Sequence, residues 1–453
     1  GTYSVRVVNG SVQSSRPGGT ACGSCIPVQT FKTDYIASTI IETNTQVGGA
    51  NPAAADPGVG IFAGAQTLGS VTIVNEGAAG LDFGFNFNTI VNTNVTGQGS
   101  LDQFIINSNE IGESGLDIEA NGIFDPAAGE DTSVFMIPPT GDALGRTADA
   151  NYASGIFDIR FVGSQLTSIT GTNTHIDGRT QTAYSGDSNP GTVGGGGTAV
   201  GISGTSLPNF ERPEIQVYNE NDEVFINEGN TNVIRNLAIF SNNKEGVLME
   251  SGSLTLTDNL IGVNAFGLNG GNISHGVHIK DGTIVIEDNF ITTTVNAGIW
   301  VEGGTSTLIQ NNHITANGQT NTDDNIKLDD GTGIVIQQNL IDYAGGIGIE
   351  GDGYNGGVLI TENTISHSGT TGTLSDTENS GMRLHGDNST ISNNIIHTNG
   401  GAGVVMAGGN TSGNLISQNS IYANGTVAVS YTHLRAHETT SLISYAVFCL
   451  KRG

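Results

Sequence analysis

An asparagine followed two residues later by an isoleucine recurs seven times between residues 259 and 421. Consecutive copies lie 23 to 31 residues apart, and a branched apolar residue always stands three positions before the asparagine. An imperfect copy begins at Asn236, with its isoleucine one place late at Ile239. Such a period with variable insertions is typical of a solenoid, in which each repeat forms one coil stacked on the next. The repeated asparagines are Asn259, Asn289, Asn312, Asn339, Asn363, Asn394 and Asn419.

The apolar positions of each repeat indicate short strands. Apolar and polar residues alternate before the asparagine, as in Leu254 to Leu256 and Ile284 to Ile286, which is the period of a strand with one buried face. A second apolar stretch lies 13 to 17 residues upstream of the asparagine and is usually opened by glycine, as at Gly298. Each repeat therefore holds at least two strands and has no room for a helix. Parallel stacking of such coils gives an all-β fold, the parallel β-helix.

The repeated asparagine and isoleucine are expected to lie inside the coil. We interpret the asparagine as a turn residue that tolerates the left-handed conformation and whose amide hydrogen-bonds along the stack. The isoleucines should form two inward rows that run from coil to coil. One row is predicted to contain Ile286, Ile336, Ile360, Ile391 and Ile416, and the other Ile291, Ile314, Ile341, Ile365 and Ile396.

This pattern resembles the right-handed parallel β-helix repeats of the pectin-lyase-like superfamily, over roughly residues 155–428. Residues 97–101 and 104–109 resemble a segment found just before such helices in large bacterial surface proteins, and residues 176–181 resemble their first coils. The resemblance implies the fold but not the activity, because lyases, hydrolases, adhesins and plain stalks share these repeats.

Three regions are predicted before the C-terminal tail. Residues 1–88 alternate apolar and polar positions between Gly/Pro-rich spacers, which suggests the end of a β-sandwich-like module. Residues 89–154 should form the N-terminal cap of the solenoid, with a short helix at 101–109 that covers its open end against aggregation. Residues 155–428 form the coils, interrupted by a glycine-rich loop at 185–204 whose Gly194–Gly197 run is not expected in the core.

The C-terminal residues 429–453 are interpreted as a non-native tail. Residues 429–439 resemble the translation of a transposase-type sequencing adaptor, and residues 443–450 resemble the flow-cell end that follows it. We therefore exclude them from reasoning about the fold and expect them to pack poorly. The alternative is a genuine amphipathic tail, but its apolar run at 442–450 is too short to span a bilayer, so no membrane insertion is expected.

Composition and charge agree with an extracellular solenoid. The formal net charge of −28 argues against nucleic acid or an anionic membrane as a partner. Before the tail the cysteines are Cys22 and Cys25, in a Cys-Gly-Ser-Cys stretch. Such a pair can be redox-active or half of a zinc site, but no second ligand pair exists, so we expect a small local disulfide formed in an oxidising compartment. The predicted localisation is extracellular or on a bacterial cell surface.

Outward positions on the glycine-opened strands carry the candidate chemistry. The second and fourth residues after each glycine should point outward, which places Gly348 in one row and Glu350 in the other. These two rows hold the chain's single tryptophan and several cations. Trp stacks on sugar rings, and Lys or Arg can bind uronate carboxylates. The candidate substrate-binding residues are His278, Lys280, Trp300, Lys327, Arg383 and His385.

The same rows contain the candidate catalytic carboxylates Glu302, Asp329 and Glu350. Because coils repeat every ~4.8 Å, neighbouring carboxylates fall near the ~5–5.5 Å of a retaining glycosidase pair and alternate ones near the ~6.5–9.5 Å of an inverting pair. The alternative is an ordinary solvated wall, with ion pairs such as Lys280–Glu302 and Lys327–Asp329. Whether the chain is an enzyme stays open.

A calcium site is a separate hypothesis. Residues 117–125 resemble the first nine positions of an EF-hand loop, with Asp117, Glu119, Asn121 and Asp125 as the candidate ligands. The twelfth position is Ala128 rather than glutamate, and the alternative is an acidic turn. We expect no other cofactor.

The sequence thus predicts a bacterial, secreted or surface-displayed β-helix protein that acts as an adhesion or structural module. Its expected partner is a polysaccharide or a host or cell-surface glycan. The alternative is a polysaccharide lyase or glycoside hydrolase acting on the face around Trp300. Long inserted loops at 267–274, 319–324 and 368–380 would favour the enzyme if they walled a deep cleft, and a flat face would favour a stalk.

Overall fold

The computed structural model of the protein describes residues 1–75, 77–118, 124–271, 273–354, 357–370, 375, 377–408 and 412–431. The chain divides into two compact units. The N-terminal unit comprises Gly1–Pro190, Pro213–Tyr218 and Glu228–Leu237, and the coil unit comprises Gly191–Arg212, Asn219–Asn227 and Ala238–Gly453. Within the described residues, neither helix is both long and apolar enough to cross a membrane.

The N-terminal unit begins with a five-stranded sheet in the order β1-β4-β2-β3, to which β5 adds by pairing with β2. Short parallel pairings follow, of β6 with β8 and of β7 with β11, which also pairs with β18. The elements of this unit are β1 (Thr2–Val7), η1 (Asn9–Ser11), β2 (Val28–Ile36), β3 (Thr39–Thr43), β4 (Thr67–Thr72), β5 (Phe83–Asn86), β6 (Thr89–Ile90), α1 (Leu101–Glu110), β7 (Asp131–Thr132), β8 (Val134–Phe135), β9 (Tyr152–Ala153), β10 (Ile156–Phe161), β11 (Thr174–Asp177), α2 (Arg179–Ser185), β16 (Ile215–Asn219) and β18 (Asn232–Arg235).

Helix α1 confirms the short helix predicted at 101–109. It begins at a serine cap, since the Ser100 hydroxyl accepts a hydrogen bond from the backbone N–H of Gln103 at 3.1 Å. Leu101 and Ile105 on its inner side are fully buried. Its polar side chains contact the segment that leads into β11, where Asn109 accepts hydrogen bonds from two backbone N–H groups and Ser108 bonds to Thr174 at 2.6 Å.

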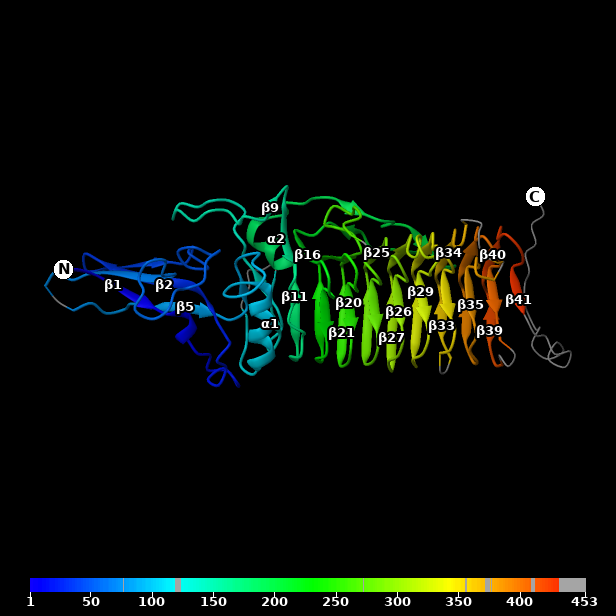
Figure 1. The fold of residues 1–453 in the computed structure, drawn as a ribbon, viewed down its shortest axis with the longest axis horizontal. Coiled ribbons are helices and arrows are strands. Elements are labelled where there is room, and N and C mark those ends of the chain that lie inside the picture. The colour runs from blue at the N-terminus through cyan, green and yellow to red at the C-terminus, as the bar shows by residue number, and fades with distance from the viewer. Residues whose placement is uncertain are drawn as a thin grey trace. The chain divides into compact units, whose positions relative to one another are not determined.

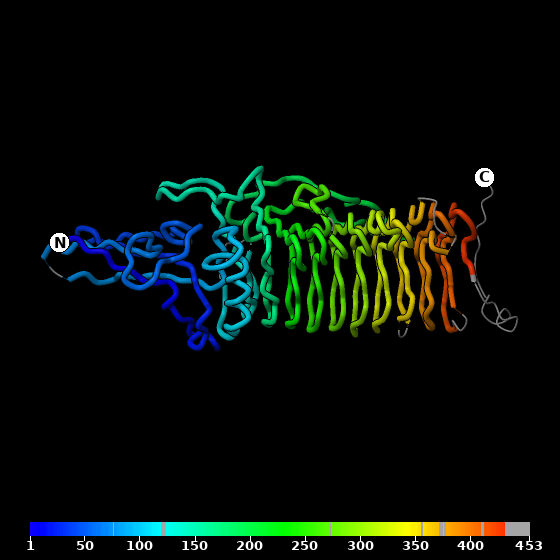
Figure 2. The backbone as a smooth tube through the Cα atoms, viewed as in Figure 1, coloured from blue at the N-terminus to red at the C-terminus, as the bar shows by residue number. Residues whose placement is uncertain are grey.

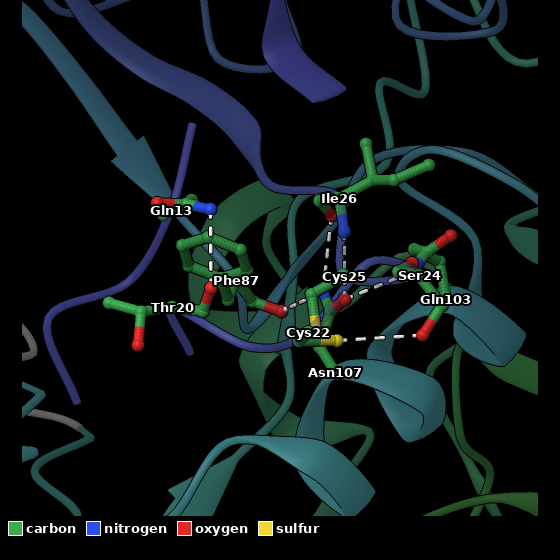
Figure 3. Close-up of a disulfide and its surroundings, with 9 residues drawn as sticks. All are labelled: Gln13, Thr20, Cys22, Ser24, Cys25, Ile26, Phe87, Gln103 and Asn107. Carbon is green, nitrogen blue, oxygen red and sulfur yellow. Dashed lines mark hydrogen bonds between the residues drawn. A yellow bond between two sulfur atoms is a disulfide. The ribbon is translucent and has the colours of Figure 1, made fainter. Parts of the chain in front are cut away.

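The disulfide expected between Cys22 and Cys25 is present, with the two Cα atoms 5.5 Å apart. Cys25 is buried against Phe87. The Asn107 side chain on α1 holds this region, because its amide donates to the carbonyls of Ile26 at 3.1 Å and Phe87 at 2.8 Å (Figure 3). The disulfide therefore ties the loop that packs against α1.

The coil unit consists of short parallel strands stacked into three sheets, so each coil has one strand more than the two that the sequence indicated (Figure 1). Sheet I contains the glycine-opened strands and the strands that pair with them: β17 (Phe225–Asn227), β20 (Val247–Met249), β23 (Val277–Ile279), β26 (Ile299–Val301), β29 (Ile326–Leu328), β32 (Ile349–Gly351), β35 (Met382–Leu384), β38 (Val404–Met406) and β41 (Val429–Tyr431).

Sheet II contains the strands that precede the repeated asparagines: β21 (Ser253–Thr257), β24 (Thr283–Glu287), β27 (Ser306–Gln310), β30 (Ile334–Gln337), β33 (Leu359–Thr361), β36 (Thr390–Ser392) and β39 (Leu415–Ser417). Sheet III holds the repeated isoleucines: β19 (Ala238–Ser241), β22 (Leu260–Ile261), β25 (Phe290–Thr292), β28 (His313–Thr315), β31 (Leu340–Asp342), β34 (Thr364–Ser366), β37 (Ile395–His397) and β40 (Ser420–Tyr422). The backbone trace passes through the three sheets once per coil (Figure 2).

Both predicted isoleucine rows are confirmed by the strand register. In sheet II, Ile286, Ile309, Ile336, Ile360, Ile391 and Ile416 pair in succession. In sheet III, Ile261, Ile291, Ile314, Ile341, Ile365, Ile396 and Ile421 do the same. Members from the central coils are fully buried, whereas Ile416 and Ile421 in the last coil are partly exposed.

The asparagine ladder is also confirmed, but its turn geometry differs from the expectation. Each asparagine uses its backbone N–H and its side-chain amide to bond the side-chain oxygen of the next, as from Asn312 to Asn339 at 2.9 and 3.0 Å. The left-handed residue is the one before the asparagine, such as Asn311 or Gln338, with φ of 55° and 56°. The turn needs positive φ one place earlier, so that the asparagine itself can point into the stack.

The same turn geometry explains the imperfect first copy of the repeat at Asn236. Asn236 has a φ of 54°, so it occupies the left-handed position rather than the ladder position. Leu237, fully buried, stands where the other coils place their asparagine, two residues before the isoleucine. The late Ile239 is therefore in register, and it pairs with Ile261.

The glycine-rich insertion forms a hairpin from Gly191 to Arg212, which we call the strap. Its strands β12 (Thr192–Val193) and β15 (Phe210–Glu211) pair antiparallel, as do β13 (Ala199–Val200) and β14 (Thr205–Ser206). Gly194, Gly196 and Gly197 are exposed, as expected for a run outside the core, but Val200 and Phe210 of the strap are buried.

The first residues of the predicted non-native tail take part in the fold. Val429 to Tyr431 form β41 and pair with β38, which corrects the expectation that the whole tail packs poorly. Parallel pairing uses backbone groups, so a short foreign segment can extend the sheet whatever its side chains. Residues 432–453 lie outside the described residues.

Candidate functional site

The outward side of sheet I carries a row of large polar side chains, which we call the central row. Strand pairing aligns His278 with Trp300, Trp300 with Lys327, Lys327 with Glu350, and Glu350 with Arg383. Glu350, rather than Gly348, thus occupies the second position of its strand. The predicted position of Glu350 was wrong because residues 346–349 contain two glycines, and Gly348 is the one that opens the strand.

A second row, the turn row, follows the strand ends. The backbone N–H of each member donates to the carbonyl of the last residue in the previous coil's strand, as from Asp329 to Val301 and from Asp352 to Leu328, at 2.8 and 2.9 Å. Glu302 and Asp329 are neighbours in this row, and Asp352 follows them. The three predicted carboxylates therefore do not form one stack, because Glu350 lies in the other row. The turn row reads Glu250, Lys280, Glu302, Asp329, Asp352 and His385.

Apolar residues end the central row in both directions. Leu248 and Val405 were expected to point to solvent, but they are only 4% and 0% exposed. Val405 packs in a small apolar cluster with Ala402 and Ala407. The polar face of sheet I therefore extends from His278 to Arg383.

Trp300 is held by its neighbours. Its ring stacks on the His278 ring, with centroids 4.0 Å apart and an 11° interplanar angle, and the Lys327 ammonium lies 5.9 Å from the ring centroid. The indole N–H donates to Asp329 at 2.9 Å. Trp300 therefore has a structural role, because neighbours on both adjacent coils contact the ring. Its part in binding stays a prediction.

Two histidines and two glutamates surround one edge of Trp300. His278 bonds to Glu302 through Nε2 at 2.8 Å and faces Glu245 at 3.9 Å, while His275 lies 3.3 Å from Glu245. Burial lowers the pKa of His278, and the hydrogen bond from Glu302 opposes this effect. Burial alone would raise the pKa of Glu245, but the His275 hydrogen bond, a backbone hydrogen bond and the charges of His275 and His278 together lower it.

Glu350 and Arg383 form the buried end of the face. Arg383 donates to Glu350 in its own row and to Glu378 in a turn. Asp324 lies behind them, 4% exposed, and accepts the backbone N–H of Ile347 at 2.6 Å. Burial raises the pKa of Asp324 well above its ordinary value, and a hydrogen bond shared with Glu350 raises it further. Burial therefore disfavours the charged form of Asp324 beside Glu350.

The remaining basic side chains of the face contact carboxylates nearer solvent. Lys280 bonds to Glu250 at 2.7 Å, not to Glu302 as predicted, because the Glu302 carboxylate bonds to His278. Lys327 lies 3.8 Å from Asp329, which confirms that expected pair. His385 lies 3.2 Å from Asp352. Exposed pairs of this kind contribute little stability.

Turn residues complete the face, and the sequence patterns did not identify them. His275, Asp324 and Glu378 lie in the three longest connections from sheet III to sheet I, at residues 262–276, 316–325 and 367–381. Each sends one side chain to the central row. These connections lack periodicity, and the only available signal was their position just before a glycine-opened strand.

The predicted calcium ligands are only partly within the described residues. Glu119 and Asn121 lie outside them. Asp117 lines a shallow hollow of about 370 Å³ together with Glu113 and Asn173. Among the described residues, no three His, Cys, Asp or Glu side chains are arranged to hold a metal ion.

The three sheets and their ladders define the chain as a parallel β-solenoid with one polar, charge-paired face. Residues 154–312 and 270–378 match the family model described as the right handed beta helix region. The coils therefore form a right-handed parallel β-helix, the fold that this model describes.

Two further comparisons concern individual proteins. No curated protein matches the chain at a significant level. Among solved structures, an alginate lyase from Paenibacillus sp. aligns with 14% identity and a TM-score of 0.33, over 48% of this chain and 80% of that one. A similarity at this level supports no inference about function.

Proposed function

We propose that this chain is a secreted or cell-surface β-helix module of a bacterium that binds a neutral glycan on the polar face of sheet I. The face joins a fixed aromatic ring to hydrogen-bonding side chains on adjacent coils, which are the groups that sugar recognition uses. The Cys22–Cys25 disulfide supports an oxidising compartment. The module then serves in adhesion or as a structural element.

The observation that carries the choice of a neutral ligand is the pairing of charges. Each cationic side chain of the two rows has a carboxylate partner, and the chain as a whole has a formal charge of −28. An acidic glycan would have to displace those carboxylates. Hydroxyl groups can instead bond to the outer edges of the existing pairs. The paired cations are Lys280, Lys327 and Arg383, and the rings of His278 and His385 also contact carboxylates.

Trp300→Ala tests the proposal. We expect the coils to stay folded and the affinity for a neutral polysaccharide to fall by ~1–3 kcal/mol, taking base–aromatic stacking as an analogue. Binding is measured by affinity electrophoresis against neutral and acidic polysaccharides. Leu308→Ala, a partly exposed residue on sheet II, is the matched control and should bind like the parent. Unchanged affinity in Trp300→Ala would leave sheet I as a solvated wall.

A second candidate function is hydrolysis or lysis of the glycan. It is favoured by Asp324 and Glu350, two hydrogen-bonded carboxyl groups of which Asp324 has a pKa raised by burial, as expected of a general acid. The same polysaccharides are therefore assayed for reducing ends and unsaturated products. Turnover that Asp329→Asn or Glu350→Gln removes, with binding retained, would support the enzyme. Binding without any product supports the adhesion module.

A further inference from the structure

The strap lies on the outward side of sheet III. The backbone N–H of Gly195 donates to His313 of β28 at 2.9 Å, and the backbone N–H of Gly201 donates to Thr364 of β34 at 3.1 Å. Phe210 of the strap packs near Phe290, with ring centroids 6.1 Å apart. The strap thus covers an aromatic and apolar patch that includes Phe290 and Leu340, which are 7% and 8% exposed.

Glycines are needed where the strap meets this patch. A Cβ on Gly194 would lie 2.6 Å from the Phe290 ring and 3.0 Å from Nδ1 of His313. A Cβ on Gly195 would lie 3.0 Å from Leu340. The backbone of the strap therefore rests directly against these side chains, which explains the glycine run.

His313 connects the strap to the sheet through both ring nitrogens. Nδ1 accepts the Gly195 N–H at 2.9 Å, so it carries no proton. Nε2 therefore holds the hydrogen and donates it to Asp342 at 3.1 Å. Phe290 packs against the ring, with centroids 5.3 Å apart. His313 is only 8% exposed, so no water molecule can easily replace either partner.

The tip of the strap has separate contacts. Ser203 donates its backbone N–H to the Glu362 carboxylate at 2.8 Å, and Ile202 donates to the Asn393 carbonyl at 3.0 Å. Gln338 donates to Thr205 at 3.4 Å. Only His313 and Glu362 among these contacts can titrate.

We propose that the strap is an acid-released cover on sheet III, closed by His313, whose opening exposes the patch of Phe290 and Leu340. A proton on Nδ1 removes the acceptor for Gly195 and sets two N–H groups against each other. Histidine is the side chain whose charge changes near neutral pH. The Asp342 carboxylate, the charged group that faces the ring, stabilises the imidazolium that forms. This device is independent of glycan binding on sheet I.

Hydrogen–deuterium exchange tests the proposal on the full chain. Exchange of a peptide covering residues 192–200 is compared at pH 7.5 and pH 5.5, with labelling times corrected for the intrinsic pH dependence. We expect about tenfold faster corrected exchange at pH 5.5, the effect of losing one buried hydrogen bond. Residues 283–287 in sheet II are the internal reference and should not change. Equal protection of the strap at both values would overturn the proposal without any variant.

Three substitutions locate the titrating group. His313→Gln offers an acceptor that does not titrate and should remove the pH dependence. Glu362→Gln keeps an acceptor for Ser203 and should retain it, as should His397→Gln, which replaces a histidine that none of the strap contacts involves. Loss of the pH dependence in Glu362→Gln and its retention in His313→Gln would assign the effect to the tip and reject His313 as the closing residue.

Discussion

At the scale of single residues, two adjacent positions recur in the coils that carry a ladder asparagine. The first adopts positive φ and points its side chain out, and the second is the ladder asparagine, whose amide is fully used inside. The outward position tolerates Asp, Asn, Gln or Glu because only its backbone is constrained. Like charges can therefore stack there, as Asp258 and Asp288 do on neighbouring coils.

Asp288→Asn should stabilise the coils in a pH-dependent manner. Burial and then the charges of Asp258 and Glu287 raise the pKa of Asp288 from 3.8 to about 6. The folded chain thus binds a proton more tightly than the unfolded chain, so stability present below pH 3.8 is lost as the pH rises through about 6.

We therefore expect Asp288→Asn to raise the melting temperature at pH 7.5 and to change it little at pH 4. Thermal unfolding at a series of pH values measures the effect. Asp281→Asn replaces an exposed aspartate in a turn and should show no such dependence. An equal effect of Asp288→Asn at both pH values would contradict the argument.

At the scale of elements, the buried rows determine the register of the sheets. Successive isoleucines in sheets II and III pair one to one, so a slip by one residue would turn each row toward solvent. In sheet I the sequence pattern determined the strand register less strictly. Residues 346–349 contain two glycine–isoleucine pairs, and either could open the strand until the neighbouring coils selected Gly348.

Ile341→Ala should strongly destabilise the coil unit. Ile341 is fully buried between Ile314 and Ile365, so its truncation leaves a cavity and should cost ~2–5 kcal/mol. Urea unfolding measures the loss. The matched control is Ile421→Ala in the last coil, which is partly exposed and should cost clearly less. Equal losses would mean that position in the stack does not matter.

At the scale of the whole molecule, stability accumulates from contacts between neighbouring coils, as expected for a solenoid. The last coil is extended by β41, whose residues resemble a foreign tail. Its pairing with β38 uses backbone groups, which the open edge of sheet I offers to any strand.

A chain ending at Tyr431 should unfold at the same temperature as the full chain, because residues 432–453 resemble a foreign sequence. A chain ending at Ala428 also loses the pairing of β41 with β38 and should unfold slightly earlier. Differential scanning calorimetry of the three chains measures this. A lower melting temperature after removal of residues 432–453 alone would count against the foreign origin of the tail.

The sequence by itself determined the coil, its isoleucine rows, the asparagine ladder, helix α1 and the local disulfide. These features repeat the same contacts at short range or join residues close in the chain, so periodicity and spacing are enough to predict them. The face on sheet I was partly predicted, since His278, Trp300, Lys327 and Arg383 follow the strand period.

Only the tertiary structure decided how those residues are used. It placed Glu350 in the central row, brought His275, Asp324 and Glu378 from non-periodic turns to the face, and surrounded Trp300 with partners. It also laid the strap on sheet III, more than a hundred residues along the chain from Gly195 to His313. Such contacts depend on the shape of neighbouring coils, which a local sequence pattern does not predict.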